Sequence, residues 1–132
     1  MIVIDASAMV ELLLCTDLGG MVKGRLASGA PRHAPHLLDT EVAQVLRRFV
    51  RQKSIAADRA RLAIEDLRAF PLRRHGHVVL LERIFELRDR LTAYDAAYLA
   101  LAEALDATLV TCDAAFARTP EAGTRIELIA SA

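Results

Sequence analysis

Cysteine and long apolar runs are scarce in this sequence. Its two cysteines, Cys15 and Cys112, have neither the number nor the spacing of a disulfide framework or a zinc site, so we interpret them as small buried hydrophobic residues. The longest apolar stretch, around residues 2–15, contains Asp5 and Glu11, which argues against a membrane-spanning helix. No basic residue precedes it, which argues against a signal peptide. We therefore expect a cytoplasmic protein without a membrane partner.

Linkers, internal repeats and low-complexity tracts are also missing from the 132 residues. A chain of this length can bury a core without disulfides. Its content of 54% hydrophobic and 26% charged residues is typical of a globular protein. We therefore expect a single domain over residues 1–132.

A net charge is lacking as well, because 17 basic residues balance 17 acidic ones, so bulk electrostatics do not predict a nucleic-acid partner. Lysine is rare, with 2 lysines against 15 arginines. Arg47, Arg48, Arg51 and Lys53 lie close together in one predicted helix, where arginine could bind phosphate groups. A solvated helix face is the alternative explanation of this cluster.

Short β-branched segments alternate with longer amphipathic ones. Strands are predicted near residues 2–4, 32–34, 107–112 and 125–130, and residues 71–77 form a turn or a short strand. Helices are predicted over residues 7–14, 18–28, 37–53, about 56–70, 78–91 and 92–105, with Ser54 as a candidate cap of the fourth helix and Pro71 as its end. Strands separated by helices predict an α/β sandwich, with a mostly parallel sheet covered on both faces.

Two carboxylates follow predicted strands. In MIVIDASAMVELL a strand leads into Asp5, and in TLVTCDAAFARTP another strand leads into Asp113. Because sites in open parallel sheets form beyond the carboxyl ends of the strands, both acids would face one crevice if their strands are neighbours. Alternatively, each acid caps the helix that follows it.

Two further acids lie on predicted helices without a cationic neighbour at helical spacing. Glu41 lies on or beside an apolar helix face, since Leu37 and Val45 are each one turn away. Asp95 lies at the start of the last, strongly apolar helix. Alternatively, Glu41 turns to solvent and Asp95 forms a capping box with Thr92.

Gathering four carboxylates is costly, because two charges about 5 Å apart repel by about 3 kcal/mol at an effective dielectric constant of about 20. Protonation or a bound divalent cation relieves this repulsion. A set of ligands made only of oxygen atoms selects Mg²⁺ or Mn²⁺ over zinc. Such ions activate water and stabilise charge at phosphate groups, which indicates a substrate containing phosphate.

The four acids occur in segments that resemble the motifs of the PIN-domain family. These segments are IVIDASAMVELL with Asp5, LLDTEVAQVLRR with Glu41, LTAYDAAYLALA with Asp95, and LVTCDAAFAR with Asp113. They follow the order of the family over residues 1–118, and the length of the chain is similar to that of VapC-type toxin ribonucleases.

This resemblance implies a three-layer α/β sandwich and an endoribonuclease dependent on Mg²⁺ or Mn²⁺. It also implies a homodimer, and a small antitoxin that fills the active-site groove. Asp5 and Asp95 would be the principal metal ligands, and Glu41 and Asp113 would complete the acidic pocket or act through water. Ser7 matches a position whose hydroxyl could bind an acid or a metal-bound water, although it could equally be a plain first-turn residue.

One departure concerns the number of metal ions. Many family members carry a further acid shortly after the position of Asp113, whereas this chain has Ala114, Ala115 and Phe116 there. The four acids are therefore compatible with a site for one metal ion or for two.

Other candidate residues have simpler explanations. The histidine pairs in HAPH and HGH, which are His33, His36, His75 and His77, are interpreted as surface or turn residues rather than zinc ligands. Tyr94 and Tyr98 could stack on bases but are more typical of a helix core. GGMVKG lacks the spacing of a phosphate-binding loop.

Two rival functions remain. A non-catalytic interaction module would keep the fold and use the acids as caps. A phosphoacceptor receiver domain would need adjacent acids after the first strand and a lysine after a late strand. Here Asp5 stands alone, and the only lysines are Lys23 and Lys53.

Overall fold

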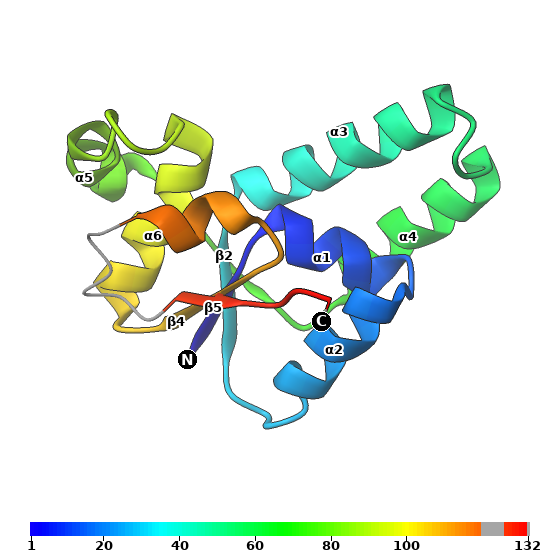
Figure 1. The fold of residues 1–132 in the computed structure, drawn as a ribbon, viewed down its shortest axis with the longest axis horizontal. Coiled ribbons are helices and arrows are strands. Elements are labelled where there is room, and N and C mark those ends of the chain that lie inside the picture. The colour runs from blue at the N-terminus through cyan, green and yellow to red at the C-terminus, as the bar shows by residue number, and fades with distance from the viewer. Residues whose placement is uncertain (120–125, 132) are drawn as a thin grey trace.

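The computed structural model describes residues 1–119 and 126–131, and a five-stranded sheet in the order β3-β2-β1-β4-β5 forms its centre (Figure 1). The strands are β1 (Ile2–Ile4), β2 (Arg32–Pro35), β3 (Arg73–His75), β4 (Thr108–Thr111) and β5 (Ile126–Leu128). The α-helices are α1 (Ala6–Leu13), α2 (Asp17–Leu26), α3 (Leu37–Arg51), α4 (Ala57–Ala69), α5 (Leu81–Glu86) and α6 (Ala93–Leu105). Two 3₁₀ helices are η1 (Val78–Leu80) and η2 (Ala114–Arg118).

The pairings between the described strands are all parallel, which confirms the predicted α/β class with helices flanking the sheet. From β1 the chain passes to β2 and then to β3 on one side, and it returns to β4 on the other side of β1. The strand order therefore reverses between β1 and β4, where Ile2 pairs with Thr108 and Ile4 with Val110. Open α/β sheets place their sites at such a reversal.

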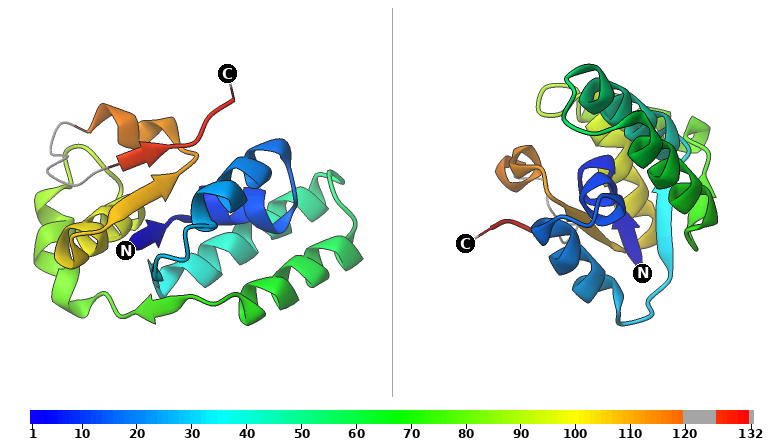
Figure 2. Two further views of the ribbon diagram at one scale, coloured as in Figure 1. Left: turned by 90° about the horizontal axis from the view of Figure 1, so that it is seen from below. Right: turned by 90° about the vertical axis from the view of Figure 1, so that its right-hand side faces the viewer.

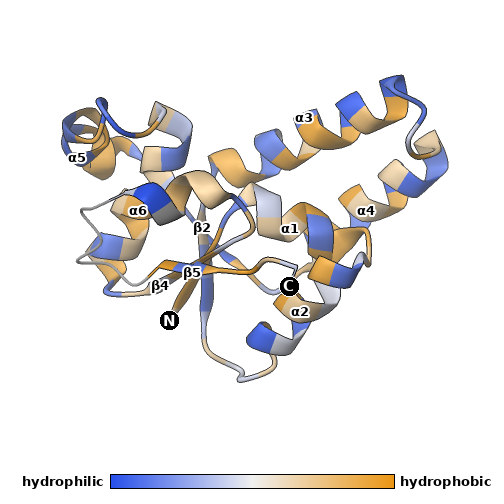
Figure 3. Ribbon diagram, in the orientation of Figure 1, coloured by the Kyte–Doolittle hydropathy of each residue, from blue (hydrophilic) through white to orange (hydrophobic). Residues whose placement is uncertain are grey.

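Burial explains why β1 is a continuous apolar run. Ile2, Val3 and Ile4 are all buried, as expected for a central parallel strand covered on both faces. Helix α6 packs on β1, β2 and β4 and buries every residue from 96 to 102, which confirms the predicted helix packed on several sides. Orange segments mark this apolar content along α6 and α1 in Figure 3.

Helices α3 and α4 form an antiparallel pair that extends away from the sheet, as Figures 1 and 2 show. Helix α3 buries Leu38, Val42 and Leu46 at the predicted helical spacing. The predicted cap of α4 is wrong. Its N-cap is Ala56, without a side-chain hydrogen bond, whereas the Ser54 amide donates to the Phe49 carbonyl and so belongs to the end of α3.

The predicted helix over residues 78–91 is also too long. The segment consists of η1 and the short α5, which ends at Glu86. In the described part of the chain, helices long and apolar enough to cross a membrane are lacking.

Helices α1 and α2 approach closely at Gly19. A Cβ atom on Gly19 would lie 2.0 Å from the backbone oxygen of Glu11, and the Gly19 amide donates to the hydroxyl of Thr16. A Cβ atom on Gly20 would meet nothing within 4 Å. Close packing of the two helices therefore requires glycine at residue 19 but not at residue 20.

These two glycines form a matched pair for a test of packing. We expect Gly19→Ala to lower the free energy of unfolding by about 1–3 kcal/mol, because the helices must move apart. Gly20→Ala should leave it unchanged or raise it by about 0.5–1 kcal/mol, since alanine is the better helix former. Urea unfolding measures both. Equal effects of the two substitutions would contradict this account of the α1–α2 contact.

Candidate active site

Asp5 lies between β1 and α1 and is the most buried of the four predicted acids, with 3% of its surface exposed. One carboxylate oxygen, Oδ1, accepts hydrogen bonds from the Ser7 hydroxyl at 2.7 Å and the Ala8 amide at 3.0 Å. The other, Oδ2, accepts one from the Thr111 hydroxyl at 2.5 Å. The pKa of Asp5 is raised to about 6, chiefly by burial and least by the charge of Asp113, while the three hydrogen bonds act to lower it.

Asp113 follows β4, the neighbour of β1, so the two strand-end acids lie at the same edge of the sheet. Its amide donates to the Thr111 hydroxyl at 2.9 Å, and its Oδ1 accepts from the Ala115 amide at 2.9 Å. The capping interpretation is thus geometrically correct for both Asp5 and Asp113. Capping occupies only part of each carboxylate, which leaves oxygen lone pairs available to a ligand.

Glu41 lies near the start of α3 and is half-buried. The Tyr98 hydroxyl of α6 donates to its Oε1 at 2.6 Å. Burial, this hydrogen bond, and the charges of Glu41, Asp5 and Asp95 all raise the pKa of Tyr98, so the phenol stays protonated as a donor. Glu41 therefore faces α6 and the other acids instead of turning away to solvent.

Asp95 connects the four acids electrostatically. It lies in the first turn of α6, and its amide donates to the hydroxyl of the N-cap Thr92 at 3.1 Å. Burial and then the negative charges of Asp113, Glu41 and Asp5, in that order, together raise the pKa of Asp95 to about 6. A single carboxylate senses all three others, so acids far apart in the sequence lie in one region.

Only neutral groups donate to these acids in the hydrogen bonds given above. None of the ion pairs formed among residues 1–119 and 126–131 involves Asp5, Glu41, Asp95 or Asp113. Within residues 1–119 and 126–131, arginine and lysine side chains therefore do not cancel the negative charge of the cluster through ion pairs. A region of this kind attracts cations.

The described part of the chain contains no closed metal cage. It has no group of three or more Asp, Glu, His or Cys residues arranged to hold an ion. Mg²⁺ does not need such a cage, because it usually keeps several waters and binds one or two carboxylates. Asp5 retains a lone pair on Oδ2, Glu41 retains Oε2, and Asp113 retains Oδ2. These oxygens and Asp95 suit an open, hydrated magnesium or manganese site.

Sequence reasoning missed the two supporting hydroxyls, Thr111 and Tyr98. Thr111 is fully buried, and its hydroxyl links the two acids. It donates to the carboxylate of Asp5 and accepts a hydrogen bond from the backbone amide of Asp113. A threonine two residues before a strand-end acid is the signal that could have identified it. Ser7, by contrast, was a candidate in the sequence, and its hydroxyl also accepts from the Cys112 amide at 2.9 Å.

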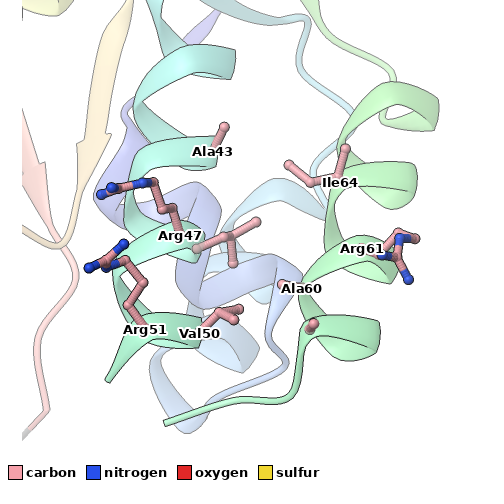
Figure 4. A pocket seen from close by; sticks show the side chains of 9 residues that line it. Ala43, Arg47, Val50, Arg51, Ala60, Arg61 and Ile64 are labelled. Atoms are coloured by element: carbon pink, nitrogen blue, oxygen red, sulfur yellow. The ribbon is translucent and has the colours of Figure 1, made fainter. Parts of the chain in front are cut away.

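The predicted arginines lie on α3, and the guanidinium groups of Arg47 and Arg51 extend away from α4 in Figure 4. Arg47 and Arg51 line an apolar groove of about 490 Å³ between α3 and α4, together with Val50 and Ile64 (Figure 4). Arg48 is seven residues, or two turns, from Glu41 and therefore lies on the side of the acids.

His33 is not a surface residue, contrary to the prediction. It lies in β2 with 7% of its surface exposed, and its Nδ1 is 2.8 Å from Nε2 of His75 in β3. Burial lowers the pKa of both rings, and the nearby charge of Arg73 lowers it further. The pair joins two strands, so its role in the sheet is structural.

The chain is similar to a protein family, to ribonucleases and to proteins of known structure. The family model of the PIN domain matches residues 2–122. Ribonuclease VapC9 of Mycobacterium tuberculosis is 41% identical over 129 residues, covering 98% of each chain. A protein of known structure from Pyrobaculum aerophilum, PAE2754, has a TM-score of 0.70 and 25% identity over 95% of this chain and 81% of its own. A toxin–antitoxin complex from Klebsiella pneumoniae contains a chain with a TM-score of 0.69, 18% identity and full coverage of both chains, a likeness of fold.

The raised pKa of Asp95 predicts how stability depends on pH without metal. Its carboxyl binds a proton more readily when folded, at a pKa of about 6, than at its ordinary value of 3.8. Its contribution to stability is therefore present at low pH and is lost as pH rises through about 6. In EDTA, we expect Asp95→Asn to melt a few degrees above the parent at pH 7.5 and to show a smaller difference at pH 5.

Asp58→Asn is the control, because Asp58 is exposed and lies outside the cluster. Measuring differences between variant and parent removes the contribution of other titrating groups, such as the histidine pair. A difference between Asp95→Asn and the parent that stays constant from pH 5 to pH 7.5 would show that Asp95 does not experience the repulsion described above.

Proposed function

This chain belongs to the PIN domain family, and we propose that its four acids form the metal-dependent active site of an endoribonuclease of the VapC toxin type. The observation that carries this proposal is that Asp5 and Asp113 follow neighbouring parallel strands and that both, with Glu41, lie near enough to Asp95 for their charges to act on it. The likeness to a ribonuclease over nearly the whole chain supports the same reaction.

We assign Asp5 and Asp95 as the principal ligands of Mg²⁺ or Mn²⁺. Asp5 would use Oδ2, since both lone pairs of Oδ1 are occupied by Ser7 and Ala8. Glu41 and Asp113, each with one oxygen free of the hydrogen bonds described, would complete the site or orient water. A bound ion would lower the pKa of water and stabilise negative charge at the phosphate.

The protein groups then have separate tasks in hydrolysis of the RNA phosphodiester bond. The hydroxyls of Ser7 and Thr111 hold the carboxylate of Asp5 in one orientation. The free oxygen of Glu41 or Asp113 accepts a proton from the attacking water. Because the two donors to Asp5 are neutral, they orient it without cancelling the charge that attracts the ion.

The proposed partners follow from the same relatives. We propose a cytoplasmic homodimer that is inhibited by a small antitoxin, whose segment fills the acidic groove. The Klebsiella pneumoniae structure, a toxin–antitoxin complex with the same fold, supports a protein partner of this kind. A non-catalytic interaction module is the alternative, in which the acids serve only as caps and Mg²⁺ has little effect on thermal stability.

The roles of the acids predict which variants lose activity. We expect Asp5→Asn and Asp95→Asn to cut total RNA at least about 100-fold more slowly than the parent in MgCl₂, because each removes an ionised ligand. Asp58→Asn should cut at the rate of the parent, and EDTA should stop all of them. If either site variant is folded and cuts RNA at the rate of the parent, the assignment of ligands fails.

The position of Arg48 on α3 predicts how RNA binds. Arg48→Ala should weaken RNA binding and reduce the slope of log affinity against log salt by about 1, as expected for one lost phosphate contact. Arg61→Ala should leave this slope unchanged, since Arg61 lies on α4 and pairs there with Asp58. Fluorescence anisotropy of a labelled RNA in EDTA at several salt concentrations measures both. An unchanged slope for Arg48→Ala would contradict its placement beside the RNA.

A further inference from the structure

Tyr98 has a buried hydroxyl that reaches across to another helix. Its side chain is 1% exposed in the core beneath α6, and its oxygen lies 2.6 Å from Oε1 of Glu41. Helix α3 packs mainly on α1 and α4, whereas α6 packs on the sheet and on α5. The Tyr98 hydroxyl therefore ties the acid of α3 to the helix that carries Asp95.

Glu41 needs such a restraint more than Asp5 and Asp113 do. Asp5 and Asp113 are short side chains held by backbone amides and hydroxyls at strand ends. Glutamate has one more rotatable bond, and ordering such a side chain costs conformational entropy. In addition, repulsion from the other carboxylates favours rotation of Glu41 away from them. A hydrogen bond to a charged acceptor is strong enough to oppose this rotation.

The chemical nature of the donor matters as well. An arginine or lysine could hold Glu41 equally firmly, but its positive charge would compete with a metal ion. The phenol of Tyr98 is neutral and donates only to Oε1, so Oε2 keeps its lone pairs and the carboxylate keeps its charge.

We propose that Tyr98 is a positioning residue, whose hydroxyl fixes Glu41 toward Asp5 and Asp95 and thereby increases the affinity of the site for a divalent cation. This inference rests on the proposed function, because it assumes that the acids bind metal. It adds a residue that contacts neither the ion nor the RNA.

Tyr98→Phe removes the hydroxyl and keeps the ring in the core. We expect this variant to bind Mg²⁺ and Mn²⁺ at least tenfold more weakly than the parent, which corresponds to about 1.4 kcal/mol. Thermal melting in a series of metal concentrations without RNA measures the affinity, and melting in EDTA shows that the variant is folded. Tyr94→Phe is the matched control, because Tyr94 lies one turn earlier on α6 and is 65% exposed.

A double-mutant cycle separates positioning from a general effect on the fold. If Tyr98 acts through Glu41, adding Tyr98→Phe to Glu41→Gln should weaken cation binding no further than Glu41→Gln alone does. Glu41→Asp leaves the core intact but shortens the side chain, so it should lose the contact with Tyr98 and bind cations at least tenfold more weakly. Because Glu41 itself belongs to the site, the informative comparison is within this variant: adding Tyr98→Phe to Glu41→Asp should weaken cation binding no further.

Each outcome has a distinct meaning. A parent protein that neither gains thermal stability from Mg²⁺ nor cuts RNA would overturn the proposed function, and this inference with it. A parent that does both, together with an unchanged cation affinity in folded Tyr98→Phe, would overturn only the role of Tyr98. The role of Tyr98 would also be overturned if Tyr98→Phe weakened cation binding by the same factor in the parent and in Glu41→Gln.

Discussion

Mutual repulsion among four carboxylates is the constraint around which this structure is built. The fold places Asp5 and Asp113 after neighbouring parallel strands, and Glu41 and Asp95 lie on two helices, with Asp95 near enough to the other three for their charges to act on it. Burial, and to a lesser extent the neighbouring charges, raise the pKa values of Asp5 and Asp95 to about 6. A protein retains such an unfavourable arrangement when function requires it, and binding of a divalent cation relieves it.

Neutral hydrogen-bond donors make this arrangement possible. Hydroxyls of Ser7, Thr111 and Tyr98 and two backbone amides orient three of the acids without reducing their charge. Arginines are plentiful in the chain, but the ion pairs of the described residues join them to other acids, such as Asp39 and Glu103. These ion pairs therefore neutralise acids outside the site, while the four acids of the site keep their negative charge and their free oxygen atoms. Orientation and charge are controlled separately.

Sequence reasoning predicted the fold class and the strand ends because these depend on local patterns. β-branched runs that lead into Asp5 and Asp113 locate both the sheet and its active edge. The contact of Tyr98 with Glu41 could not be predicted, since it joins residues 57 positions apart. For Thr111 a local signal existed, but its bond to Asp5, 106 positions away, depends on the pairing of the strands. The Ser54 cap and the single helix over residues 78–91 failed for the opposite reason. There, local propensity competed with the tertiary path of the chain, and the tertiary path prevailed.

The central claim is that the four acids share one divalent cation site, and a crystal grown with Mn²⁺ tests it most directly. Anomalous scattering identifies manganese independently of the protein atoms. We predict an anomalous peak between the carboxylates of Asp5 and Asp95, with Glu41 and Asp113 facing it directly or through water. Crystals in saturating Mn²⁺ with no peak at this position, or with a peak only at other side chains, would contradict the account.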